Sequence, residues 1–163
     1  MGHRLTKDEF FMSLLDQFAA RSTCPRRQVA CIVTDVKGHI LGTGYNGVPS
    51  GLPHCIDIPC PGAKDPSGDS SRCMAIHAEQ NALLQCHRLD LAHNLYVQCT
   101  PCLTCAKLIS NTSIRRIIFF DWYTDTTGST LLEGLGRTLH RVSREEIRPQ
   151  GPDAPGKPAD ARG

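Results

Sequence analysis

The chain has 163 residues, 40% of them hydrophobic and 21% charged, and a formal net charge of +2. This size and composition predict one globular domain, and the near-neutral charge argues against a nucleic-acid-binding surface. No apolar run is long enough to cross a bilayer, and the first residues do not resemble a signal peptide, so we expect a cytoplasmic protein without membrane contacts. Nine cysteines without a secretory signal favour metal ligation over disulfides.

The first elements are a helix and two strands. A helix is predicted over 6–22, because Thr6 and Glu9 match a capping box and apolar residues follow at helical spacing. Strands are predicted over 29–34 and 39–43, joined by a short turn.

Gly44, Tyr45, Asn46 and Gly47 follow the second strand. Two glycines so close together indicate a backbone that bends sharply or lies against a ligand. One interpretation is a plain turn. The other is a loop that presents the Asn46 amide, a donor and an acceptor, to a base or a sugar.

A long stretch over 48–72 is rich in proline and glycine, and such stretches are usually functional or disordered. A loop with little core of its own gains order from a structural metal. Four thiols before, within and just after this stretch are candidates for a second, closed zinc site, with His54 as the main substitute: Cys24, Cys55, Cys60 and Cys73. The alternative is that they are free thiols in a mobile loop.

The strongest motif combines His77 and Glu79 with Cys102 and Cys105. Each pair stands at the start of a predicted helix, where the helix dipole favours thiolates. One histidine and two thiolates leave the fourth position of a catalytic zinc open for water, and this pattern is typical of zinc nucleobase deaminases. Glu79 is too close to His77 in sequence to be a comfortable second ligand, so we predict that it moves protons.

Each part of this motif also has an ordinary interpretation. His77 alone could be a packed or surface histidine, the cysteine pair could be half of a zinc knuckle or a redox pair, and Glu79 could be a helix-start carboxylate. Their joint occurrence in this order favours a catalytic site. A deaminase of nucleic acid would need a basic stripe with interleaved aromatics, and a non-enzymatic zinc-binding interaction module would not need Glu79.

The second half of the chain alternates between helices and strands. Helices are predicted over 77–88, 102–110 and 129–135, and strands over 95–98, 114–120 and 138–142. This alternation predicts parallel strand pairs in a mixed five-stranded sheet with helices on both faces. We assign 1–148 to the catalytic domain and expect 149–163, rich in proline and glycine, to be a disordered tail.

The chain resembles the deoxycytidylate (dCMP) deaminase family of the cytidine deaminase superfamily over about 10–125. The matching segments are 21–24, 44–47, 49–51, 54–55, 77–82 and 101–107, with Tyr123 and Asp125. The metal motif alone marks the superfamily. The Gly-Tyr-Asn-Gly stretch and the cysteine-bearing insertion, by which we mean the stretch over 48–72, resemble the dCMP branch, especially its bacterial and phage members.

The resemblance implies a three-layer α/β/α fold, a homo-hexamer and hydrolysis of dCMP to dUMP and ammonia, in the host cytoplasm if the chain is viral. It also implies activation by dCTP with Mg²⁺ and inhibition by dTTP. The alternatives are deamination of nucleic acid or of a free nucleoside.

The resemblance also suggests roles for residues outside the metal motif. Expected substrate contacts are Asn46, Ala78 and Tyr123, while Ser22, Arg26 and Arg27 are candidates for the 5′-phosphate by position only, with a solvated charged turn as their alternative. The residues that resemble regulatory positions are Gly44, Tyr45, Gly47 and Arg88.

Overall fold

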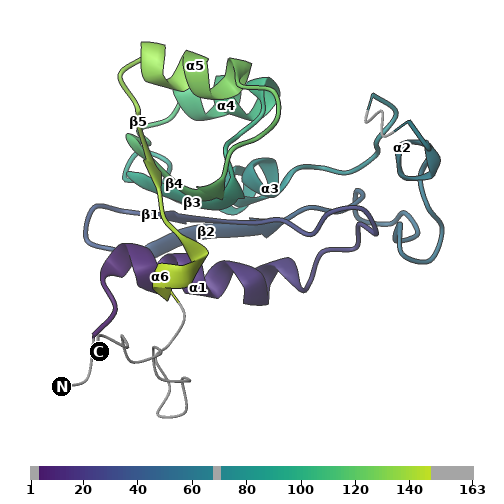
Figure 1. Cartoon of the computed structure of the whole chain (residues 1–163), viewed down its shortest axis with the longest axis horizontal. Coiled ribbons are helices and arrows are strands. Elements are labelled where there is room, and N and C mark those ends of the chain that lie inside the picture. The colour runs from purple at the N-terminus through teal and green to yellow at the C-terminus, as the bar shows by residue number, and fades with distance from the viewer. Residues whose placement is uncertain (1–3, 68–70, 148–163) are drawn as a thin grey trace, which may run out of the picture.

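The computed structural model describes residues 4–67 and 71–147. A five-stranded sheet lies between two layers of helices (Figure 1), as predicted. Its strands are β1 (Ala30–Thr34), β2 (Ile40–Tyr45), β3 (Asn94–Cys99), β4 (Arg116–Asp121) and β5 (Thr138–Arg141). The helices are α1 (Lys7–Ala19), α2 (Pro61–Lys64), α3 (Ala78–Gln85), α4 (Leu103–Ser110), α5 (Thr127–Gly134) and α6 (Arg144–Ile147).

The sheet is mixed, with the spatial order β2-β1-β3-β4-β5. β1 pairs antiparallel with β2 and β3, whereas β3, β4 and β5 run parallel. Parallel neighbours need crossover connections, and α4 and α5 supply them. α1 and α6 cover one face of the sheet, and α3, α4 and α5 cover the other (Figure 1). Each face therefore has its own apolar core.

Several predicted boundaries need adjustment. The first helix ends at Ala19, before the predicted position 22, and α3 ends at Gln85 because Cys86 adopts an extended backbone. Two four-residue helices, α2 and α6, were not predicted. The predicted tail, 149–163, lies outside the described residues. Within the described part of the chain, no helix has the length and apolar character needed to cross a membrane.

α3 lies directly on the backbone of the edge strand β2. Gly42 and Gly44 are two residues apart in β2, so both face the same side. A Cβ added at Gly44 would lie 2.4 Å from the Ala78 carbonyl oxygen and 2.4 Å from the Ala82 nitrogen. The two alternatives for 44–47, a turn or a ligand contact, therefore omit a role that the structure shows for Gly44: it allows a helix to pack directly against the strand.

Candidate active site

Two helix N-termini meet at the site, and backbone hydrogen bonds position each of them. Ile76, directly before α3, exchanges two hydrogen bonds with Gly47, at 3.2 and 2.8 Å. The His77 nitrogen donates to the Gln80 side chain at 2.8 Å. Cys102 is the N-cap of α4, and its carbonyl accepts from Ala106 at 2.8 Å. The ends of α3 and α4 thus bring the two halves of the motif together.

The three predicted ligands have separations that fit zinc. Nδ1 of His77 lies 3.5 Å from Sγ of Cys102 and 3.4 Å from Sγ of Cys105. Zinc bonds of about 2.0 Å to nitrogen and about 2.3 Å to sulfur, at a tetrahedral angle, separate these atoms by about 3.5 Å. Within 4–67 and 71–147, this is the one group of three or more potential ligands whose ligand atoms all lie within 4.8 Å of one another.

The surroundings of the two thiols differ. Hydrogen bonds with Cys105 and His77 lower the pKa of the Cys102 thiol to about 4. The neighbouring Cys102 sulfur and burial raise the pKa of Cys105 far above its usual range. The hydrogen bond with Cys102 also raises the pKa of His77. The protein alone therefore stabilises the thiolate of Cys102. A second thiolate at Cys105, directly beside it, would need a bound cation to be stable.

Glu79 is buried beside this group. Its exposed fraction is 5%, and it lines the same pocket as His77 and Cys102. Burial raises the pKa of its carboxyl group. A desolvated carboxyl group in a pocket is well suited to accept and release protons.

The pocket has a volume of about 310 Å³ and collects most of the expected substrate contacts. Besides the metal motif, its lining includes Asn46, Ala78, Tyr123, Arg26 and Arg27. It also contains residues that the sequence reasoning did not select, among them Val29, Ala75, Cys99 and Thr100. Of these residues, Thr100 could have been found from the sequence, because it stands directly before Pro101, which opens the second half of the motif.

The side chain of Asn46 is held by three hydrogen bonds to the chain. Its Oδ1 accepts from the Ser22 hydroxyl at 2.6 Å and from the Val29 nitrogen at 2.9 Å, while its Nδ2 donates to the Arg27 carbonyl at 2.8 Å. The oxygen is thus engaged by the protein, and the amide cannot offer a ligand the donor and acceptor pair that we expected. Ser22 is 5% exposed and is not among the pocket-lining residues, so it orients Asn46.

An arginine and a tyrosine face each other in the pocket. The guanidinium carbon of Arg27 lies 5.9 Å from the centroid of the Tyr123 ring. The Tyr123 nitrogen donates to the Thr100 hydroxyl at 2.8 Å. These contacts fix the loop after β4 against the wall of the pocket.

The four thiols near the insertion interact, but less closely than the ligands around His77. Cys60 lies near enough to Cys55 and Cys73 to influence their pKa values, and Cys24 interacts electrostatically with Cys55 and Cys73. A backbone hydrogen bond from Met74 lowers the pKa of Cys60 to about 7. We call these four residues the thiol cluster. His54, the predicted substitute, lines a different cavity.

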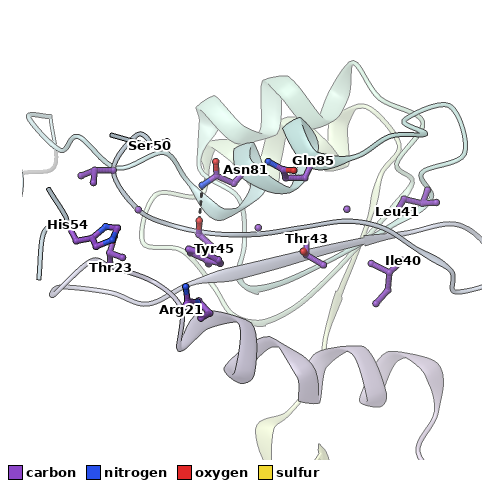
Figure 2. Close-up of a pocket in the computed structure, with 14 residues that line it drawn as sticks. Arg21, Thr23, Ile40, Leu41, Thr43, Tyr45, Ser50, His54, Asn81 and Gln85 are labelled. Carbon is purple, nitrogen blue, oxygen red and sulfur yellow. Dashed lines mark hydrogen bonds between the residues drawn. The ribbon is translucent and has the colours of Figure 1, made fainter. Parts of the chain in front are cut away.

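That second cavity, of about 740 Å³, lies along β2 and α3 (Figure 2). Gly44, Tyr45 and Gly47 line it, and the Asn81 amide donates to the Tyr45 carbonyl at 2.8 Å. Three of the four expected regulatory residues are therefore gathered at one cavity. The fourth, Arg88, is not among its lining residues and forms an exposed ion pair with Asp90 at 2.7 Å.

Comparisons with known proteins agree with this geometry. Residues 5–121 match the model of the family described as the cytidine and deoxycytidylate deaminase zinc-binding region. The deoxycytidylate deaminase of Mycobacterium phage D29 is 40% identical over 119 residues, which cover 69% of this chain and 92% of the phage protein. The Saccharomyces cerevisiae deoxycytidylate deaminase is 36% identical over 145 residues, 85% of this chain and 46% of the yeast protein. The chain thus spans about half the length of the yeast relative.

A solved structure is also similar. The crystal structure of dCMP deaminase from the cyanophage S-TIM5, in complex with dCMP and dUMP, superposes with a TM-score of 0.70 at 27% identity. The match covers 86% of this chain and 100% of the cyanophage chain.

Proposed function

This chain belongs to the cytidine and deoxycytidylate deaminase family, and from that premise we propose that it hydrolyses dCMP to dUMP and ammonia with a catalytic zinc. The observation that carries the proposal is the placement of His77, Cys102 and Cys105 at zinc-ligand separations with a buried Glu79 beside them. The names of the phage relatives supply the substrate.

The chain's own residues supply the proton transfers. His77, Cys102 and Cys105 would hold the zinc, which would lower the pKa of a bound water from about 15.7 to about 7. Glu79 accepts a proton from the water whose oxygen adds to C4 and delivers a proton to N3 of the cytosine ring. It then takes the remaining proton from the new C4 hydroxyl and passes it to the amino group, so the C4–N bond breaks, the C4 oxygen becomes the carbonyl of uracil, and ammonia leaves. One carboxyl group thus serves both halves of the reaction.

The rest of the pocket is proposed to bind the nucleotide. Asn46 has its side-chain oxygen engaged, so it offers a ligand a donor, and Tyr123 borders the base or sugar. The Ala78 backbone contacts the base. Arg26 and Arg27 give the pocket two guanidinium groups, which suit a 5′-phosphate.

The proposed reaction is tested by ultraviolet absorbance during incubation with dCMP, cytidine and a single-stranded oligonucleotide. We expect rapid loss of the cytosine spectrum with dCMP and much slower change with the others. Faster turnover of the oligonucleotide or of cytidine would identify the substrate as nucleic acid or a free nucleoside. A folded, zinc-loaded protein inert toward all three would favour a binding module.

We further propose that the thiol cluster holds a structural zinc. We predict two zinc ions per chain by metal analysis of the purified protein. Cys55→Ser is expected to remove one ion and leave the ion at His77, because the two ligand sets share no residue. Cys86→Ser, a half-buried thiol outside both sets, is the control and should leave two ions. A wild-type protein with one ion per chain, unaffected by Cys55→Ser, would contradict the proposal.

We propose that the larger cavity binds nucleotides that regulate the activity, and that the protein assembles as a homo-hexamer. It adjoins Gly44, Tyr45 and Gly47, and its volume of about 740 Å³ is within the range of small-molecule sites. We expect dCTP with Mg²⁺ to sharpen the dCMP saturation curve and dTTP to lower activity at subsaturating dCMP. The two should compete, since one cavity would hold both. Coupling energies of about 1–3 kcal/mol correspond to apparent-affinity changes of about 5- to 150-fold.

These effects are measured by dCMP saturation curves with each triphosphate, beside light scattering for the size of the assembly. Asn81→Ala, which removes the hydrogen bond across the cavity, should weaken both effects, and Arg88→Ala tests the remaining expected position. A hyperbolic curve indifferent to both triphosphates, from a monomer, would remove the regulatory proposal and leave the deaminase proposal intact.

A further inference from the structure

Gly62, in the cysteine-bearing insertion, contacts one of the two arginines of the substrate pocket. Its carbonyl oxygen accepts a hydrogen bond from Nη1 of Arg26 at 2.7 Å, although the two residues are 36 positions apart. Arg26 lines the pocket that contains His77 and Glu79. Because a guanidinium group is planar and rigid, this bond restricts the orientations that the group can adopt.

The Gly62 carbonyl is itself fixed by close backbone packing. A Cβ at residue 62 would lie 2.6 Å from the nitrogen and 2.7 Å from the Cα of Cys73. The Gly62 nitrogen also donates to the Arg72 carbonyl at 3.2 Å. Contacts with backbone atoms cannot be relieved by a rotamer change, so a larger residue must move the carbonyl.

The insertion is also joined to the chain segment that leads into Arg26. The Ile56 nitrogen donates to the Thr23 carbonyl at 3.1 Å, three residues before Arg26. Cys24 and Cys73 belong to the thiol cluster and also line the pocket. The insertion therefore packs against residues that line the substrate pocket, Arg26 among them, without lining the pocket itself.

We propose that the insertion sets the preference for a 5′-phosphorylated pyrimidine over the free nucleoside, with Gly62 as the positioning residue for Arg26. The proposal rests on the function proposed for this pocket and assigns the Arg26 guanidinium to the phosphate. Arginine binds phosphate through parallel, charge-assisted hydrogen bonds whose strength depends on orientation. Arg27 lies over the Tyr123 ring, so Arg26 is the arginine whose orientation the insertion controls.

The test measures dissociation constants of dUMP and deoxyuridine by calorimetry on the zinc-loaded protein. Arg26→Ala should weaken dUMP binding by about 10- to 100-fold, in line with a lost hydrogen bond to a charged group, with little effect on deoxyuridine. Gly62→Ala should weaken dUMP binding by about 3- to 10-fold. In the Arg26→Ala background, Gly62→Ala should change nothing further, because the two act as one unit.

Two other variants keep the test interpretable. Gly134→Ala is the matched control, since a Cβ there meets no atom within 4 Å. Ala63→Gly makes the backbone beside the Gly62 carbonyl more flexible without a steric clash, and should lower the preference for dUMP by about twofold. This variant replaces Gly62→Ala in the test if Gly62→Ala does not fold.

The proposal is overturned if Gly62→Ala weakens both ligands equally, or weakens dUMP equally with and without Arg26. It is also overturned if the preference for dUMP survives both Gly62→Ala and Ala63→Gly. Turnover of dCMP, measured separately, distinguishes the two claims. A protein that prefers dUMP through Gly62 and Arg26 but does not deaminate dCMP refutes the reaction alone.

Discussion

Replacing Glu79 by glutamine is expected to lower kcat for dCMP by about 10³-fold or more while zinc content and folding stay unchanged. The amide is nearly isosteric with the carboxylate, but it can neither accept the water proton nor deliver one to the ring or to the leaving amine. Single general acid–base groups contribute about 10²–10⁴-fold, and here one group serves two steps. Steady-state kinetics, metal analysis and circular dichroism check the three parts of this expectation.

Glu133→Gln is the matched control, since Glu133 is an exposed residue of α5 outside the pocket. It should leave kcat within about twofold of wild type, as expected for a surface substitution. Activity near wild type in Glu79→Gln would rule out the proposed proton carrier. Loss of zinc in that variant would instead place Glu79 among the groups that hold the metal.

Gly44→Ala is expected to lower the free energy of unfolding by about 3 kcal/mol or more and to lower activity with it. The new methyl group would meet the backbone of α3 at 2.4 Å, so the helix that carries His77 and Glu79 must move away from β2. Overpacking costs about 1–3 kcal/mol when side chains can adjust, and backbone atoms adjust less. For a chain of this size, about 3 kcal/mol lowers Tm by roughly 6–12 °C.

Thermal and denaturant unfolding check this expectation, with Gly134→Ala as the control. Gly134 ends α5 with open space beside it, so its substitution should change Tm by only a few degrees. If Gly44→Ala melted like wild type but lost only the response to triphosphates, the glycine would serve a ligand rather than the helix.

The elements with strong local signals were predictable from the sequence. The Thr6 and Glu9 capping box forms both of its hydrogen bonds at the start of α1. The two metal helices begin where His77 and Cys102 predicted them, and their ligands converge. Capping and short-range spacing act within one turn of chain, so the sequence contains most of the information that determines them.

The features that were missed depend on contacts between distant segments. The contact of Gly44 with α3 joins residues that are far apart in sequence, and a pair of glycines has no signal that distinguishes a helix contact from a turn. Ser22 and Asn46 are 24 positions apart, so the sequence contains no local pattern that predicts the hydrogen bond from the Ser22 hydroxyl to the Asn46 side-chain oxygen. The helices α2 and α6 have four residues each, too few for a periodic pattern to be recognised.

The stretch of chain that holds the metal ligands also bears on the order in which the protein assembles as it folds. His77 and Cys105 are 28 positions apart, and α3, β3 and α4 form one continuous stretch of chain. Closing this loop of 28 positions costs less chain entropy than closing the loop of 79 positions between Arg26 and Cys105. The metal ligands therefore lie within one short stretch of chain, whereas the substrate pocket also needs Arg26 and Asn46, which flank the β1 and β2 hairpin. We expect the three ligands to approach one another early in folding, and the pocket to be complete only when β1 has paired with β3 and α3 has packed on β2.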